Sequence, residues 1–292
     1  MEEVIYLNGS LVPRSEAKVS VFDHGFLYGY GLFETMRVYN GRIFLLERHI
    51  ERLIASAAVI GFKVGLSGTD LRKACTETVM ANNLNEARVR LTVTNGEADT
   101  FPWTDTAGKN TVVITARPYT PFSEEKYRHG FRVGIASLRR NSQSQVSGIK
   151  SNNYLDNILA KMEAERDSLD EALLLNEKGY ITECGSSNIF FVSDSGLITP
   201  SETNGLLPGI TRGLVIELAG KLDIKFTETD VGLSDLNTFQ EAFITSSMME
   251  IMPLVSVRDE TGYTHIIGDG KPGQITRHLT IAYRERVERE IS

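Results

Sequence analysis

The sequence predicts a mixed α/β (α+β) protein that is divided into two domains. The chain has 292 residues, which is more than one typical domain needs. Both halves contain runs with alternating apolar residues, typical of strands, and runs whose apolar residues recur at helical spacing. A stretch with Pro118 and Pro121 separates the halves. We therefore expect a small N-terminal α/β domain over 1–117, an interdomain linker over 118–130 and a larger C-terminal domain over 131–292.

The first half opens with a predicted β-hairpin, because Asn8-Gly9 lies between two short apolar runs. A glycine-rich bend follows over 25–31 and is not followed by a helix, which excludes a dinucleotide-binding fingerprint. Ile50, Leu53, Ile54 and Ala57 form the apolar stripe of the first predicted helix. The expected elements are strand 32–38, helices 46–60 and 71–80, and strands 88–94 and 111–116.

The second half alternates strands with helices. Its first helix begins with an apolar pattern made by Leu155, Ile158, Leu159 and Met162. The expected elements are strand 131–137, helix 154–168, two hairpins (172–175 with 180–182, and 187–192 with 197–199), helix 212–222, strand 226–230, short helix 233–238, strand 242–245 and helix 275–291.

Composition excludes several classes of function. The formal net charge of −7 argues against a nucleic-acid-binding surface, and no partner of that kind or anionic membrane is expected. The two cysteines, Cys75 and Cys184, are too few for a disulfide framework or a metal site, which suits a reducing cytoplasm. No basic-then-apolar leader and no run of eighteen apolar residues occurs, so we expect a cytoplasmic protein without a membrane segment.

Lys150 is the first candidate for chemistry. It lies in the run SGIKSNNY, among small and amide side chains and close to the start of a predicted helix. An amine in that setting suits Schiff-base chemistry, although most lysines are solvated surface charges.

Three other segments could serve one cofactor together with Lys150. Ile210 and Thr211 open a predicted helix, and Ser246-Ser247 follows a strand, so both could bind a phosphate. Glu183, after a predicted strand in the small-residue turn ITECGSSN, could face a pyridine nitrogen, although spacing alone favours a loop-tip glutamate in solvent. An amine, a phosphate site and a carboxylate together are what pyridoxal phosphate requires.

Histidines and serines do not support other chemistries. The five histidines show no H-x-x-x-H spacing, and His24 and His49 have no partner that the sequence reveals. No G-x-S-x-G motif occurs. We expect neither a metal site nor a serine hydrolase.

With these residues in view, the sequence resembles the class IV aminotransferases, the fold-type IV pyridoxal-phosphate enzymes. The resemblance runs nearly end to end, through YLNG, VFDHGFLYGYGLFETMR, LLERHIERL, ARVRLTVT, IKSNNYLDNILAK, NEKGYITECGSSNIFFV, LLPGITR, FITSSMMEIMP and IGDGKPGQITR. It implies a C-terminal domain that is β-barrel-like, pyridoxal 5′-phosphate as cofactor and a homodimer as the minimum assembly.

The resemblance also implies roles for single residues. Lys150 is similar to the Schiff-base lysine, Glu183 to the partner of the pyridine nitrogen and Tyr154 to the tyrosine that bonds the phenolic oxygen. The residues implied for the phosphate are Arg48, Ile210, Thr211, Ser246 and Ser247. The residues implied for the substrate pocket are Tyr28, Phe33, Thr35, Arg37, Arg88 and Arg90.

The subfamily stays open. Thr35 and Arg88 stand where branched-chain aminotransferases usually have glycine and tyrosine, and GLFET and ARVRL resemble aminodeoxychorismate lyases. Arg88 beside Arg90 would suit a substrate with more than one carboxylate, or could pair with an acid at the pocket rim. We expect an aminotransferase that moves an amino group from a branched-chain or D-amino acid to a 2-oxo acid. The alternative is a lyase that forms 4-aminobenzoate and pyruvate, and a binding protein without chemistry is disfavoured because Lys150, Glu183 and Tyr154 are all present.

The preference for L- or D-substrates also stays open. It depends on how the pocket arginines and the loop over 95–105 are arranged, and the composition of that loop gives no geometry.

Overall fold

The computed structural model describes residues 2–61, 63–97 and 110–291. The chain forms two compact units. Unit 1 consists of residues 1–120, 149–153 and 290–292, and unit 2 consists of residues 121–148 and 154–289. The short segment around Lys150 therefore belongs to unit 1, although its neighbours in sequence belong to unit 2.

Unit 1 is built on a six-stranded antiparallel sheet with the order β2-β1-β6-β5-β3-β4. Asn8 and Gly9 connect β1 and β2 in the predicted hairpin, and both have positive φ, as a tight turn of this kind requires. The strands are β1 (Val4–Leu7), β2 (Ser10–Pro13), β3 (Gly31–Tyr39), β4 (Arg42–Ile43), β5 (Ala87–Thr94) and β6 (Val112–Pro118).

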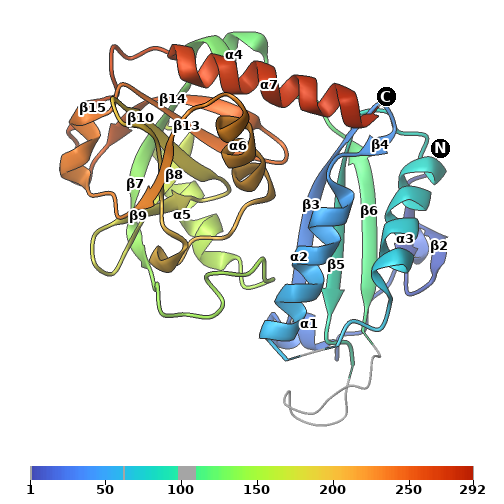
Figure 1. The fold of residues 1–292 in the computed structure, drawn as a ribbon. Helices are drawn as coiled ribbons and strands as arrows, with labels where there is room; N and C mark the ends of the chain where they lie inside the picture. Colours follow the sequence, from blue (N-terminus) through green and yellow to red (C-terminus); the bar gives the residue numbers. More distant parts are fainter. Residues whose placement is uncertain (1, 62, 98–109, 292) are drawn as a thin grey trace. The chain divides into compact units, whose positions relative to one another are not determined.

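Helices α2 (Leu46–Val59) and α3 (Gly68–Ala81) cover one face of this sheet (Figure 1). Ser67 and Asp70 close a reciprocal capping box at the start of α3, which fixes where that helix begins. The buried stripe of α2 differs from the predicted one, because Ile54 is 40% exposed and both His49 and Ser56 are buried.

The remaining helical turns of unit 1 are short. The predicted glycine-rich bend contains helix α1 (His24–Tyr28), whose first turn is capped by the Asp23 side chain. A 3₁₀ turn, η1 (Arg14–Glu16), follows β2. The predicted loop over 95–105 lies largely outside the described residues.

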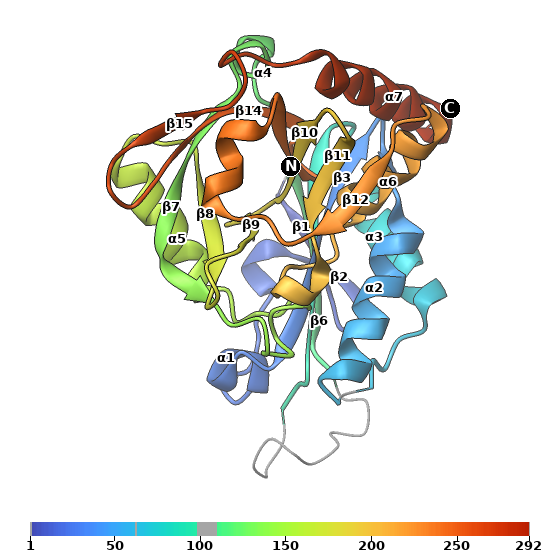
Figure 2. The ribbon, with the colours of Figure 1, turned by 60° about the vertical axis from the view of Figure 1, so that its left-hand side comes forward.

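Unit 2 is built on a nine-stranded, curled sheet with the order β12-β11-β10-β13-β14-β7-β8-β9, with β15 paired to β14 (Figure 2). The curled form is the barrel-like domain that the sequence predicts. Its strands are β7 (Phe131–Arg140), β8 (Glu171–Asn176), β9 (Ile181–Cys184), β10 (Asn188–Ser193), β11 (Gly196–Pro200), β12 (Phe226–Thr229), β13 (Glu241–Ser246), β14 (Glu250–Arg258) and β15 (Thr264–Ile266).

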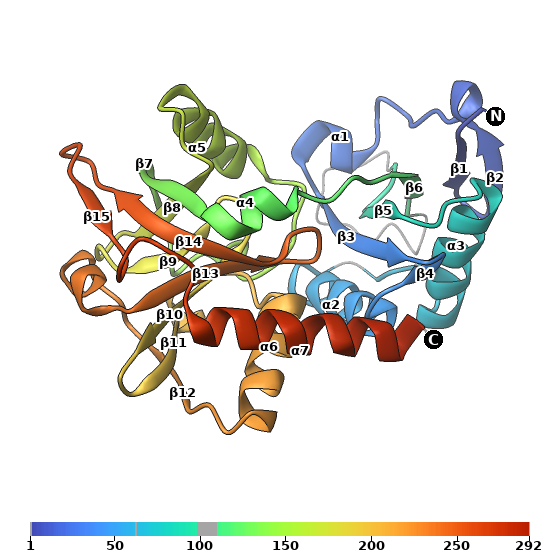
Figure 3. The same cartoon turned by 90° about the horizontal axis from the view of Figure 1, so that it is seen from above.

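Helix α5 (Leu155–Arg166) crosses between the parallel strands β7 and β8 and lies beside both (Figure 3). Small residues, Ala160 and Ala164, make its contact with these strands. Leu155, Ile158, Leu159 and Met162, the predicted apolar pattern, are instead 47–64% exposed. The stripe that signals this helix therefore does not pack into the core of unit 2.

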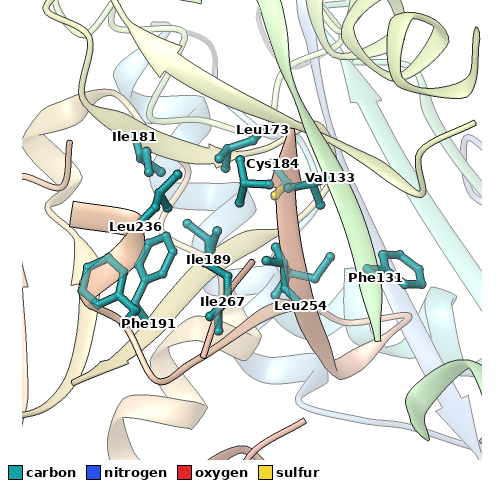
Figure 4. Close-up of a cluster of buried hydrophobic side chains, with 14 of the residues drawn as sticks. Phe131, Val133, Leu173, Ile181, Cys184, Ile189, Phe191, Leu236, Leu254 and Ile267 are labelled. Carbon is teal, nitrogen blue, oxygen red and sulfur yellow. The ribbon is translucent and has the colours of Figure 1, made fainter. Parts of the chain in front are cut away.

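The main core of unit 2 lies inside the curled sheet (Figure 4). Phe191 of β10 stacks on Phe239 with ring centroids 4.4 Å apart, and Ile189 and Leu254 pack in the same cluster. The remaining elements are helices α4 (Glu124–His129), α6 (Ile210–Lys221) and α7 (Gln274–Ile291), and 3₁₀ turns η2 (Glu202–Asn204) and η3 (Leu233–Thr238). Helix α4 lies within the segment 118–130 that the sequence predicts as a linker, and the domain boundaries stay a prediction.

Candidate active site

The segment that carries Lys150 is fastened to the start of β3. The N–H of Phe33 donates to the Lys150 carbonyl at 2.9 Å, and the N–H of Asn152 donates to the Gly31 carbonyl at 2.9 Å. Ser151 forms an antiparallel bridge with Leu32. These backbone bonds on both sides fix the Cα of the lysine, so its amine moves only through its own side-chain torsions.

The Lys150 amine lies against an aromatic ring. Its Nζ is 4.6 Å from the centroid of the Phe33 ring, and the guanidinium carbon of Arg90 is 3.8 Å from the same centroid. Both contacts have cation–π geometry. The amine and the guanidinium therefore lie no farther apart than the sum of these two distances, so the structure places the expected Schiff-base lysine near an expected substrate residue.

One face of the sheet carries most of the expected substrate residues. Alternation along β3 places Phe33, Thr35 and Arg37 on this face, and the register pairs Thr35 with Arg90 and Arg37 with Arg88. Arg37 is only 5% exposed, and its guanidinium carbon lies 4.4 Å from the Tyr39 ring and 4.9 Å from the Tyr119 ring. Its position is thus set by two aromatic side chains.

Tyr28 and Arg48 lie on other elements of unit 1. Tyr28 ends helix α1, is 48% exposed and makes an edge contact with the His24 ring at 5.4 Å. Arg48 is half-buried in the first turn of α2. Neither belongs to the sheet face that carries Phe33.

The opposite face of the sheet holds a buried charged network that the sequence analysis missed. Glu34 is 1% exposed, and its two carboxylate oxygens accept hydrogen bonds from Arg52 Nε at 2.7 Å and from Arg52 Nη2 at 2.6 Å. Its Oε2 also lies 2.7 Å from His49 Nδ1. Burial works against the charged form, but Arg52 and His49 outweigh it and hold the pKa of Glu34 at about 2. Burial lowers the pKa of His49. The sequence reveals no partner for His49, and the structure gives it Glu34.

A signal for this network was present in the sequence. Glu34 alternates with Phe33 and so faces the helices, while His49 and Arg52 are three residues apart and share one side of a helix. Arg52 has a side chain that is 14% exposed and is oriented by both oxygens of a carboxylate. It is therefore a second candidate, besides Arg48, for binding an anion.

In unit 2, Glu183 lies in strand β9 and is 5% exposed. Its Oε1 accepts from Arg140 Nη2 at 2.5 Å, and its Oε2 accepts from the N–H of Leu207 at 3.1 Å and from Asn188 Nδ2 at 3.3 Å. The alternative of a loop-tip glutamate in solvent is wrong. Arg140, which the sequence analysis did not select, supplies the charge that compensates this buried carboxylate.

The turn after Glu183 is held by three side chains. The Tyr154 hydroxyl donates to the Gly185 carbonyl at 3.1 Å, and Asn157 Nδ2 donates to the same oxygen at 2.8 Å. Ser186 Oγ donates to the buried carboxylate of Glu171 at 2.6 Å. Tyr154 is thus linked to the turn that directly follows the expected partner of the pyridine nitrogen.

Asn188 connects the remaining candidates of unit 2. Besides Glu183, its Nδ2 donates to the Leu207 carbonyl at 2.8 Å, and in the sheet Asn188 pairs with Thr245. A Cβ on Gly209, the residue before helix α6, would lie 1.9 Å from Asn188 Oδ1, so this approach requires glycine. Asn188 therefore brings together Glu183, the start of α6 and the end of β13.

The expected phosphate residues of unit 2 fit an anion. Thr211, 3% exposed, lies in the first turn of α6, where backbone N–H groups are available to an acceptor. Ser246 ends β13, and its hydroxyl accepts from the N–H of Met249 at 3.2 Å. The buried hydroxyl of Thr245, beside Ser246 and Ser247, has no hydrogen-bond partner. A buried hydroxyl without a partner in this position suits a ligand rich in acceptor oxygens.

Other kinds of site are not supported. Within the described residues there is no group of histidine, cysteine and acidic side chains that could hold a metal ion, and no helix is long and apolar enough to cross a membrane.

Comparison with known proteins agrees with this geometry. The family model described as amino-transferase class IV matches residues 31–257. The chain is 38% identical over 282 residues to "Putative branched-chain-amino-acid aminotransferase" of Methanocaldococcus jannaschii, with 96% of this chain and 95% of that protein covered. It is 35% identical over 297 residues to D-alanine aminotransferase of Listeria monocytogenes, with coverage of 98% and 96%.

A lyase and a solved structure are similar to a comparable degree. Aminodeoxychorismate lyase of Bacillus subtilis is 32% identical over 290 residues, with 99% of this chain and 96% of that protein covered. The crystal structure of branched-chain amino acid aminotransferase from Escherichia coli matches with a TM-score of 0.88 and 31% identity, covering 98% of this chain and 94% of that one.

Fold and family together define a fold-type IV enzyme. The chain belongs to the class IV aminotransferase family, as the sequence predicts. It is a pyridoxal-phosphate-dependent aminotransferase.

Proposed function

We propose that the enzyme transfers the amino group of an amino acid, of the branched-chain or D-amino acid type, to a 2-oxo acid, with Lys150 as the Schiff-base lysine. The observation that carries this proposal is the anchored Lys150, whose amine shares the Phe33 ring with Arg90. The similarity to a branched-chain and a D-alanine aminotransferase supports both donor types.

The family resemblance assigns the residues that would hold the cofactor. Glu183 would bind the ring nitrogen and Tyr154 the phenolic oxygen. The residues proposed for the phosphate are Ile210, Thr211, Ser246, Ser247 and either Arg48 or Arg52. Arg52 is favoured by its orientation on Glu34, and Arg48 by the family resemblance.

The chain's own residues divide the chemical work. When bound, pyridoxal phosphate forms a Schiff base with an amine and withdraws electrons from the substrate Cα. The Lys150 amine would take the proton from the substrate Cα and pass it on to the cofactor, and a positioned base typically contributes about 10²–10⁴-fold in rate. Glu183, beside the Arg140 guanidinium, presents a carboxylate to the ring nitrogen. Arg90, near the amine, receives a substrate carboxylate.

The lyase that forms 4-aminobenzoate and pyruvate is the second candidate. Arg88, in place of the tyrosine usual in branched-chain enzymes, and the similarity to the Bacillus subtilis lyase favour it. Its substrate would use the same lysine but no amino acceptor.

A homodimer in the cytoplasm is part of the proposal. Unit 1 exposes Phe22, Phe26 and Tyr28 by 48–72%, and α5 in unit 2 exposes an apolar stripe by 47–64%. Apolar areas of this kind commonly mark interfaces. Light scattering on the purified protein tests this, with Phe26→Asp and Ile158→Asp expected to shift the dimer toward monomer, and a monomeric wild type would contradict it.

The first experiment is spectroscopic. Purified protein loaded with pyridoxal phosphate should show a visible absorption band, and borohydride should fix the cofactor on Lys150, whereas Lys150→Ala should lose both. A panel of L- and D-amino acids should then convert the cofactor to its pyridoxamine form. Release of 4-aminobenzoate and pyruvate without that conversion would establish the lyase, and absence of cofactor fixation would contradict both candidates.

Measurements of cofactor affinity can show which of Arg48 and Arg52 binds the phosphate. Cofactor titration of the apoenzyme should show a loss of roughly 10–100-fold for whichever of Arg48→Gln and Arg52→Gln removes a charge-assisted hydrogen bond to phosphate. The other variant should stay within a few-fold of the wild type, and equal losses would mean that neither arginine acts alone.

A further inference from the structure

Three arginines form a row across the middle of the unit 1 sheet. The register places Arg88 of β5 directly opposite Arg37 of β3 on one side and directly opposite Arg117 of β6 on the other. Residues opposite one another have Cβ atoms about 4.5–5.5 Å apart, and like charges in such pairs destabilise a sheet. Repulsion within the row therefore destabilises the sheet locally, and an acidic partner offsets this repulsion for the outer arginines but not for the central one.

The outer arginines have acidic partners. Arg37 Nη2 lies 3.7 Å from Glu86 Oε2, and Arg117 Nε donates to Glu3 Oε1 at 2.7 Å. The central arginine, Arg88, is exposed, and no acidic side chain of the described ranges pairs with it. The alternative that Arg88 pairs with an acid at the pocket rim is thus not what the described residues show.

The row lies on the same sheet face as the Lys150 amine. Arg88 and Arg90 are two residues apart on β5 and so point the same way, separated by roughly 7 Å along the strand. Arg90 shares the Phe33 ring with Lys150, so the opposed pair Arg37 and Arg88 supplies the next cations along this face. Of these two, Arg37 already has Glu86 as an acidic partner, which leaves Arg88 for an anion of the ligand.

We infer that Arg88 is a specificity-determining residue that receives a second carboxylate of the substrate, so that the enzyme favours amino substrates with two acidic groups over aliphatic ones. This inference rests on the proposed function, because it assigns the substrate class of the same site: among the donors proposed there, it favours acidic amino acids over branched-chain ones. A second carboxylate supplies the anion that the centre of the row lacks, and a guanidinium can bind it through two parallel hydrogen bonds. Charge-assisted hydrogen bonds of this kind change affinity by roughly 10–100-fold.

Matched ligands separate charge from shape. Succinate and 4-methylvalerate differ only in that a carboxylate replaces an isopropyl group, and aspartate and leucine differ in the same way. Titration of the cofactor-loaded enzyme should show tighter binding of succinate than of 4-methylvalerate by roughly tenfold or more. Arg88→Tyr should remove that preference and leave 4-methylvalerate affinity within about twofold. Arg117→Gln, in the same row but paired with Glu3, is the matched control and should leave both affinities unchanged.

Turnover distinguishes the source of the second carboxylate. The wild type should convert aspartate or glutamate, in the L- or D-form, with higher kcat/KM than leucine, or should act on 4-amino-4-deoxychorismate, and Arg88→Tyr should reduce that advantage roughly 10–100-fold. An unchanged succinate to 4-methylvalerate ratio in Arg88→Tyr, or an equal change in Arg117→Gln, would overturn the inference. An enzyme that binds succinate through Arg88 yet converts none of these substrates would instead contradict the proposed function.

Discussion

Glu34 and Glu183 are two buried glutamates, one in each unit, and each is compensated by an arginine in a different way. Glu34 receives two hydrogen bonds from Arg52 and a contact from His49, so both oxygens face ionisable side chains. Glu183 receives one bond from Arg140, and its other oxygen accepts from a backbone N–H and an amide. A buried glutamate can therefore be stabilised by ionisable side chains, as at Glu34, or by a charged side chain together with neutral hydrogen-bond donors, as at Glu183.

The two glutamates are therefore expected to have different roles. Glu34 lies on the helix-covered face of its sheet, where its charge is matched inside the fold. Glu183 precedes a turn fixed by Tyr154 and Asn157, and the Arg140 guanidinium supplies charge beside its carboxylate. We therefore expect loss of the Glu34 network to affect stability, and loss of Arg140 to affect mainly cofactor binding.

The largest effect is expected for Glu34→Gln. The change removes the Glu34 carboxylate from Arg52 and His49, and breaking a buried ion pair typically costs about 3–5 kcal/mol. Urea unfolding of the apoenzyme should show this loss of unfolding free energy. Glu47→Gln, on the exposed side of α2, is the control and should cost less than about 1 kcal/mol. A loss below about 1 kcal/mol for Glu34→Gln would show that the network is not structural.

Arg140→Met is expected to come next. It removes the Arg140 guanidinium from the buried Glu183, which disfavours the charged carboxylate that a protonated ring nitrogen needs. We expect cofactor affinity to fall roughly 10–100-fold, with partial recovery in Arg140→Lys. Fluorescence titration of the apoenzyme with pyridoxal phosphate measures this, and an affinity equal to that of the wild type would mean that neutral donors suffice.

The pH dependence of stability sharpens the comparison further. Because the folded pKa of Glu34 is depressed from 4.5 to about 2, its stabilising contribution is present above pH 4.5 and is lost as the pH falls toward 2. The folded pKa of His49 is also depressed, from 6.5, so protonation of the unfolded chain lowers stability as the pH falls below 6.5.

Unfolding free energies measured between pH 7 and 3 should therefore decrease with acid in the wild type. His49→Gln should flatten the part of the curve just below pH 6.5, and Glu34→Gln should flatten the part below pH 4.5. If His49→Gln keeps the wild-type slope below pH 6.5, burial of a neutral imidazole is not its cause.

The smallest effect is expected for Asn188→Ala. This change removes one neutral donor from Glu183 and the bond to the Leu207 carbonyl, which together are worth about 1–3 kcal/mol. Cofactor affinity should fall less than in Arg140→Met. If it falls more, Asn188 contributes through its contact with the start of α6 rather than through Glu183.

Much of the fold could be predicted from the sequence because the determining signals are local. Asn8-Gly9 specifies a hairpin, and alternation along β5 specifies the common direction of Arg88 and Arg90. The family, the cofactor and the candidate lysine follow from motifs whose order is distinctive. These features depend on neighbours a few residues away, which a sequence displays directly.

Contacts between residues that are far apart in the sequence could not be predicted from it. Lys150 is anchored to β3 by pairing with residues more than one hundred positions earlier, and the Arg140–Glu183 and Glu34–Arg52 pairs join different elements. The exposed stripe of α5 carries the same pattern as a buried one, so periodicity could not show which face is covered. The sequence by itself determined which residues are available for chemistry, and the three-dimensional pairing decided which charges compensate one another, because electrostatic partners are selected by distance in space.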